Sequence, residues 1–105
     1  MKTKEFTLLQ LFPIVDGRLA DSMNDVYDVL GFLCGDESIS TIGLTMVADR
    51  LDSLEPKPQW WYDAKADIDT IIDNLKENYD FDDIITDVRK IKTKYELEPL
   101  NLVYK

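Results

Sequence analysis

The chain has 105 residues, of which 45% are hydrophobic, and this suffices for one packed core but not for two domains. Its 21 acidic residues outnumber 12 basic ones, and the formal net charge of −9 disfavours direct binding to nucleic acid phosphates. The absence of histidine removes the commonest general base and the commonest transition-metal ligand.

A short first helix is predicted near the N-terminus. Thr7 fits the N-cap position, and Gln10, three residues later, completes a capping box. Pro13 lacks the N–H that would bond to the carbonyl of Leu9, so we expect a short or kinked helix. It should end near Asp16–Gly17, because glycine adopts the left-handed conformation of a helix C-cap without strain.

The stretch 22–36, SMNDVYDVLGFLCGD, predicts a second helix, around which we expect the other elements to pack. Its apolar residues recur at spacings of three and four, which place them on one face, and Val29 and Phe32 form a second apolar edge. The main face contains Met23, Val26, Tyr27, Leu30, Leu33 and Cys34. Asp21 or Ser22 would cap this helix, and Gly35–Asp36 would end it.

A third helix is predicted from Ser40 or Thr41, and Pro56 and Pro58 end it because proline cannot continue a helix. Its inward residues are Leu44, Val47, Ala48, Leu51 and Leu54. This spacing gives the helix a single apolar stripe for packing against its neighbours.

The segment 56–62, PKPQWWY, is predicted as the main connection of the chain and contains both tryptophans. One interpretation is that Trp60 or Trp61 closes one end of the core, helped by the stiff flanking prolines. The other is that one ring stays exposed as an interface anchor, because tryptophan is common at binding hot spots. Two adjacent indoles seldom point the same way, so each interpretation can hold for one ring.

Two further helices are predicted after this connection. The fourth begins with Asp63 as its N-cap, and the fifth follows a tight turn at residues 78–80, so the two should form an antiparallel helical hairpin. The expected inward residues are Ile68, Ile71, Ile72, Leu75 and Tyr79, then Phe81, Ile84, Ile85, Val88, Ile91 and Tyr95. The tail 100–104 alternates enough to lie extended along the body or against a partner.

Together these elements predict an all-α protein, a compact bundle of about five helices whose last two form an antiparallel helical hairpin. We expect a single helical domain over residues 1–105. The apolar runs are short and the N-terminus leads directly into a capped helix, so we expect a soluble, cytoplasmic protein without a membrane span. Cys34, the single cysteine, lies within an apolar face and fits a buried, inert thiol in a reducing compartment.

The sequence contains no pattern of a catalytic or cofactor site, and we expect neither an enzyme nor a cofactor. The pairs Asp67–Asp69 and Asp80–Asp82 resemble parts of calcium loops, but both lack the central glycine and the glutamate at the twelfth position. There is no glycine-rich phosphate loop and no cysteine or histidine zinc spacing. Carboxylates on exposed helix faces also lack the environments that separate the pKa values of a catalytic pair. We therefore predict no metal site.

The negative charge is concentrated in residues 63–87, where nine acids stand against Lys65 and Lys76, a net charge of −7. A rigid helical frame can present such carboxylates at spacings that imitate a phosphate backbone. It would then occupy the basic groove of a nucleic-acid-binding protein, with long-range attraction speeding its capture. The alternative is that this acidic face only keeps a small protein soluble.

A pattern in residues 5–36 comprises EFTLLQLF, then Gly17-Arg18-Leu19, then a helix containing VYDVLGFL, and finally Gly35-Asp36. This pattern resembles a family of small proteins encoded by bacteriophages and prophages, in which a GRL turn precedes a helix that ends in GD. Family members often continue with a histidine-containing segment, which residues 39–44 lack. The resemblance implies no biochemical activity. It implies a phage gene product that acts in the cytoplasm of a bacterial host.

We therefore expect a non-enzymatic acidic binding protein that inhibits a host nucleic-acid-handling or defence protein through a DNA-mimicking carboxylate face. Its partner would be a host or phage protein with a basic surface, and it would bind neither nucleic acid nor membrane directly. The predicted partner-binding residues are Asp67, Asp69, Asp73, Glu77, Asp82, Asp83, Asp87, Trp60 and Trp61.

The alternative is a structural or assembly module that forms a homodimer, or contacts another phage protein, through apolar residues near Trp60 and the C-terminal tail. Ionic strength separates the two hypotheses, because charge-driven capture weakens in salt whereas an apolar interface persists. A transcription regulator would need a basic recognition helix. The candidate for that helix, residues 89–94, has acidic neighbours that argue against it.

Overall fold

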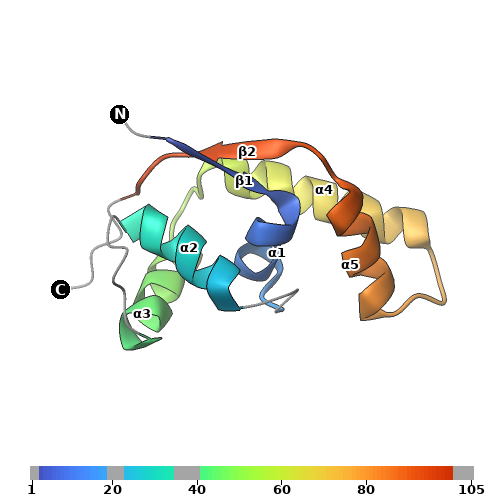
Figure 1. The fold of residues 1–105 in the computed structure, drawn as a ribbon, viewed down its shortest axis with the longest axis horizontal. Coiled ribbons are helices and arrows are strands. Elements are labelled where there is room, and N and C mark those ends of the chain that lie inside the picture. Colours follow the sequence, from blue (N-terminus) through green and yellow to red (C-terminus); the bar gives the residue numbers. More distant parts are fainter. Residues whose placement is uncertain (1–2, 19–22, 35–40, 101–105) are drawn as a thin grey trace.

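The computed structural model describes residues 3–18, 23–34 and 41–100, the side chains of 41–46 excepted. In chain order it contains β1 (Lys4–Thr7), α1 (Leu8–Asp16), α2 (Met23–Cys34), α3 (Thr41–Asp52), α4 (Gln59–Leu75), α5 (Phe81–Lys90) and β2 (Lys94–Leu97) (Figure 1). This part of the chain is mostly helical and has five helices, as predicted. It is not purely α, because β1 and β2 form a small sheet.

The sheet pairs β1 with β2 in antiparallel orientation, with Phe6 opposite Tyr95 and Lys4 opposite Leu97. In β2 the side chains alternate, Lys94 exposed and Tyr95 and Leu97 buried, which is the two-residue period of a half-buried strand. The prediction that the fifth helix continues to Tyr95 is therefore wrong. The helix ends at Lys90, and the chain is already extended at the next residue.

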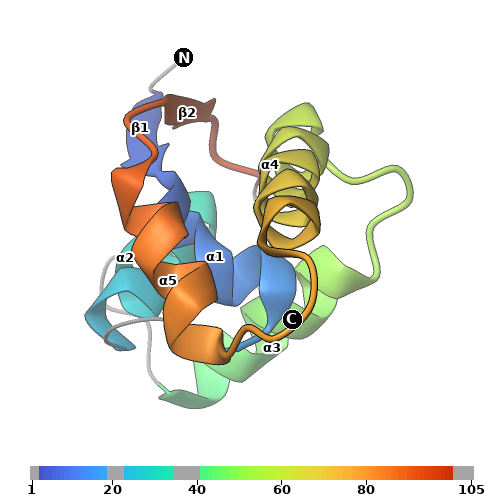
Figure 2. The same ribbon diagram turned by 90° about the vertical axis from the view of Figure 1, so that its right-hand side faces the viewer.

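The short helix α1 lies at the centre of the fold, in contact with α2, α4, α5 and β1 (Figure 2). Leu8, Leu11 and Phe12 are fully buried, because this nine-residue helix is apolar on most of its sides and needs neighbours on all of them. The expectation that the stretch 22–36 organises the fold is thus wrong. The main contacts of α2 are with α1 and α3.

Both predicted ends of α1 are confirmed. Thr7 is the N-cap, and its side chain and that of Gln10 bond reciprocally to each other's backbone N–H groups in a capping box. Pro13 lies inside the helix without ending it. Gly17 then ends the helix in the left-handed conformation, with φ of 92°, and its N–H donates to the carbonyl of Pro13 at 3.1 Å.

The buried face of α2 is rotated relative to the prediction. Val29, Leu30 and Leu33 are buried, whereas Met23, predicted to point inward, is 45% exposed. Cys34 is only partly buried, and its thiol lies 3.5 Å from the carbonyl oxygen of Gly31. The predicted caps of this helix and the start of the third helix at Ser40 lie outside the described residues.

The start of α4 differs from the prediction. The helix begins at Gln59, with Pro58 as its N-cap residue, and both tryptophans belong to its first turn instead of a connecting loop. The ring of proline fixes its φ near the helical value, and Pro58 has φ of −60°. Its ψ of 152° is extended, as is usual for an N-cap residue, so the helix can start directly after it. Asp63, predicted as the N-cap, lies inside the helix and accepts a bond from Gln59.

Helices α4 and α5 are consecutive and pack against each other, but they do not lie side by side in the antiparallel orientation of the predicted hairpin. They cross obliquely, since Figure 2 shows α4 nearly end-on and α5 running across the view. Their connection contains two residues with positive φ, Lys76 and Asn78. The turn ends at Asp80, which caps α5 through a reciprocal capping box with Asp83 that the sequence interpretation missed.

The C-terminal segment returns to the body after β2. The N–H of Leu100 donates to the carbonyl of Leu33 at 2.8 Å, which ties this segment to the end of α2. The rest of the predicted extended tail, from residue 101, lies outside the described residues.

Candidate functional site

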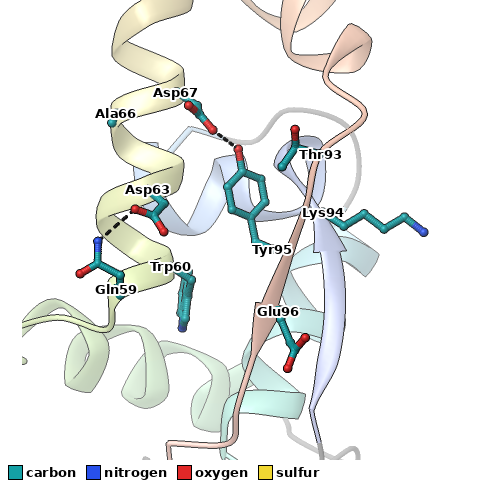
Figure 3. A pocket seen from close by; sticks show the side chains of 9 residues that line it. All are labelled: Gln59, Trp60, Asp63, Ala66, Asp67, Thr93, Lys94, Tyr95 and Glu96. Carbon is teal, nitrogen blue, oxygen red and sulfur yellow. Dashed lines mark hydrogen bonds between the residues drawn. The ribbon is translucent and has the colours of Figure 1, made fainter.

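A cleft of about 550 Å³ lies between the first turns of α4 and strand β2 (Figure 3). Its residues come from two segments far apart in the sequence, α4 and the chain around β2, which contact each other in the fold. It is lined by Gln59, Trp60, Asp63, Ala66, Asp67, Thr93, Lys94, Tyr95 and Glu96. The cleft therefore combines carboxylates with aromatic rings, a lining that suits a small polar or charged ligand group.

Asp67 and Tyr95 connect the two walls of the cleft. The Tyr95 hydroxyl donates a hydrogen bond to Oδ2 of Asp67 (Figure 3). Burial of the ring, and then this hydrogen bond, raises the pKa of Tyr95 above its ordinary value, so the phenol stays protonated and remains a donor. Beside them, Oδ1 of Asp63 accepts a hydrogen bond from Nε2 of Gln59 at 3.0 Å.

The charge inside the cleft is negative. Asp63 and Asp67 lie one helical turn apart, on the side of α4 that faces Tyr95 (Figure 3). Lys94 lines the cleft with its backbone, but its side chain extends away from α4 in the same view. Its ammonium group therefore does not neutralise the two carboxylates.

A second negative region, which we call the acidic end, comprises residues 73–83 at the end of α4, the turn and the start of α5. It contains five carboxylates and one lysine, a net charge of −4. Among them Asp73, Glu77 and Asp82 are exposed and form no ion pair with any residue in the described part of the chain. This region forms one extremity of the molecule (Figure 1).

The seven predicted contact acids do not share one face. Asp67 lies in the cleft, whereas Asp69 and Asp73, two and six residues later, lie on other sides of α4, because successive helical residues advance by about 100°. Asp69 is exposed and pairs with Lys65 at 2.9 Å. A single row of carboxylates along α4 is thus not formed.

Two of the three predicted acids of α5 have structural partners. The carboxylate of Asp83 accepts the N–H of Asp80 at 3.1 Å as part of the capping box. Asp87 is half-buried and pairs with Lys90 at 3.5 Å. Asp82, in contrast, is exposed and makes no side-chain bond with the described residues. It is therefore the predicted acid of α5 that is most available to a partner.

The two tryptophans have different environments. Trp60 is 8% exposed and belongs to the core, as one of the two interpretations predicted, with only a small part of its surface on the cleft. Trp61 is partly buried, contacts Tyr62 edge to face and lies under the ammonium group of Lys57. Tyr62, at 43%, is the more exposed ring. An aromatic contact with a partner would therefore use residues 61–62 and not Trp60.

Several site residues were not identified from the sequence. The sequence pattern predicts Tyr95 on the inner face of a helix, Asp63 as a helix cap and Gln59 in a loop. The alternation of buried and exposed residues over 94–97 is the signal that would have indicated a strand, and with it the second wall of the cleft.

In the ranges that the structure describes, no group of three or more histidine, cysteine, aspartate or glutamate residues is arranged to hold a metal ion. The helices of these ranges also include none whose length and apolar character would let it cross a membrane.

Comparisons of the chain with protein-family models, with curated proteins and with solved structures find no match. The similarity of residues 5–36 to small phage proteins therefore stays a prediction. A function has to be inferred from the geometry and charge of this chain alone.

Proposed function

We propose that this protein is a non-catalytic acidic binding protein that captures a partner protein through the partner's basic surface. The acidic end provides the main contact, with Asp73, Glu77 and Asp82 as its central residues. In the context that residues 5–36 imply, the protein is phage-encoded and inhibits a nucleic-acid-handling or defence protein in the cytoplasm of a bacterial host. Its carboxylates would then take the place of nucleic acid phosphates.

The observation that carries this proposal is the exposure of these three carboxylates without an ion pair among the described residues. Exposed charges of one sign at an extremity of a molecule raise the local potential and accelerate association with an oppositely charged surface. The other predicted acids contribute less, because Asp69 and Asp87 are paired with lysines and Asp83 caps a helix.

The proposal is tested by reversing the charge of the acidic end. A triple variant with Asp73→Lys, Glu77→Lys and Asp82→Lys should lose the proteins that the tagged wild type retains from a bacterial lysate at low salt. A matched triple variant, with Asp49→Lys, Asp52→Lys and Glu55→Lys, makes the same change of net charge at exposed positions outside the acidic end. It should retain those proteins.

Mass spectrometry of the retained proteins is the readout, and circular dichroism checks that both variants keep their helix content. Equal loss in both variants would mean that only net charge matters, which contradicts the proposal. Retained proteins that resist high salt would favour the alternative, a structural or assembly module. Trp61 and the exposed Tyr62 are the aromatic residues that such a module could use, since Trp60 is buried.

A further inference from the structure

Three carboxylates line the cleft between α4 and β2, of which Asp63 and Asp67 come from α4 and Glu96 comes from β2. Asp63 and Asp67 are four residues apart on one helix, and like charges at this spacing repel each other. No lysine or arginine in the described ranges forms an ion pair with either one. By comparison, Asp69 on the same helix has Lys65 as its partner.

Each of these carboxylates keeps hydrogen-bonding capacity. Asp67 uses Oδ2 for the Tyr95 hydroxyl, and Asp63 uses Oδ1 for the amide of Gln59. The second oxygen of each carboxylate accepts no hydrogen bond from any residue that the structure describes. One carboxylate oxygen of Asp63 and one of Asp67 are therefore available as acceptors, on adjacent turns of α4.

The remaining lining indicates which kind of cation fits. Tyr95 is 7% exposed, and this exposed part lies on the opposite wall of the cleft, where an aromatic ring attracts organic cations. A metal ion would require more oxygen ligands than this pair supplies, and the described residues offer no third one in place. A planar guanidinium, with five donors, matches two neighbouring carboxylates better than a point charge does.

We propose that this cleft binds the arginine side chain of a partner protein, with its guanidinium between Asp63 and Asp67 on α4 and the ring of Tyr95 on β2. The inference rests on the proposed function, because it gives the basic surface of the partner a specific anchor. The volume of about 550 Å³ exceeds that of one side chain, so the arginine can enter while attached to its own backbone.

The test uses a defined probe, an acetylated glycine-arginine-glycine amide, in a nuclear magnetic resonance titration of the full chain. Shifts should concentrate on the side-chain amide of Gln59 and on the backbone N–H groups of residues 93–96. Asp67→Asn and Asp63→Asn should each weaken binding by at least about tenfold, since a charge-assisted pair is lost. Asp67→Asn keeps an acceptor for Tyr95, so the fold is preserved.

The matched control is Asp69→Asn, which removes the same charge from the same helix outside the cleft. It should change the affinity by less than about twofold, as exposed charges contribute little. Equal weakening by all three variants would overturn the proposal, because it would indicate a general charge effect. Shifts spread over the acidic end would overturn it as well.

The same titration with the lysine peptide and with spermidine identifies the source of the cation. Weaker binding of both than of the arginine peptide supports a partner's arginine. Equal or tighter binding of spermidine would assign the cleft to a free polyamine, and tighter binding of the lysine peptide would exclude the guanidinium. Either result overturns the proposal as stated.

The failure of this inference can be distinguished from the failure of the proposed function. If reversal of the acidic end abolishes partner capture but the arginine peptide does not bind, only the cleft assignment is wrong. If the peptide binds in the cleft but the two charge-reversal variants capture proteins equally, only the role of the acidic end is wrong.

Discussion

The hydroxyl of Tyr95 donates a hydrogen bond to the carboxylate of Asp67, and this contact joins strand β2 to helix α4 across 28 positions of the sequence. Tyr95 is itself buried, with only 7% of its surface exposed. The contact fixes one side of the cleft, so the position of the cleft carboxylates depends on a residue of the sheet.

Removal of this hydroxyl should destabilise the fold. Tyr95→Phe keeps the ring but leaves a half-buried carboxylate without its donor, and we expect a loss of about 1–2 kcal/mol in the free energy of unfolding. Urea denaturation followed by circular dichroism measures it. Tyr79→Phe, at an exposed ring that forms no such bond with the described residues, should change the same quantity by less than about 0.5 kcal/mol. Equal losses would show that the Tyr95–Asp67 bond contributes nothing specific.

The raised pKa of Tyr95 predicts how stability depends on alkaline pH. Above about pH 10 the unfolded chain releases the Tyr95 proton while the folded chain keeps it, so the unfolded state binds fewer protons. The contribution of this residue is therefore complete below about pH 10 and is lost as the pH rises further.

Wild type should thus lose stability faster than Tyr95→Phe between about pH 10 and about pH 12, because the two chains differ only in this hydroxyl. Urea midpoints at several pH values measure the difference. Parallel pH profiles would contradict the pKa shift. A phenolate absorbance titration gives an independent check, since one of the five tyrosines should ionise later than the rest.

Local signals in the sequence predicted most helices correctly, because their causes are local. Thr7 and Gln10 form the capping box that their spacing indicates, and Gly17 ends α1 in the left-handed conformation. Ile84, Ile85 and Val88 are buried, as the apolar stripe of α5 predicts. These features depend on interactions within a few residues, which sequence patterns report directly.

The sheet could not be predicted in the same way. Tyr95 continues the helical spacing of α5, and only its pairing with Phe6, about 90 residues away, makes the strand favourable. Both strands are four residues long, so their alternation is too short to outweigh a helical pattern. The cleft was missed for this reason, since one of its walls is β2.

The capping box of α5 gives a third prediction. Asp80→Ala removes the acceptor for the N–H of Asp83 and should lower the free energy of unfolding by about 1 kcal/mol. Asp82→Ala removes a carboxylate from the same turn without removing a capping bond, so it should cost less than half as much. Thermal denaturation of both variants measures the difference. Equal costs would assign the effect to charge near the helix N-terminus and not to capping.

The C-cap of α1 gives the last prediction, because α1 contacts four other elements and its end sets where the chain leaves the core. Gly17 has φ of 92°, and no atom of the described residues lies within 4 Å of the position that a Cβ would take. Gly17→Ala should therefore cost about 1 kcal/mol through backbone strain alone, without any clash. Gly17→Asn should cost less, since asparagine tolerates the left-handed conformation better than alanine does. Urea denaturation of the two variants measures this ranking, and an alanine variant as stable as wild type would contradict the left-handed cap.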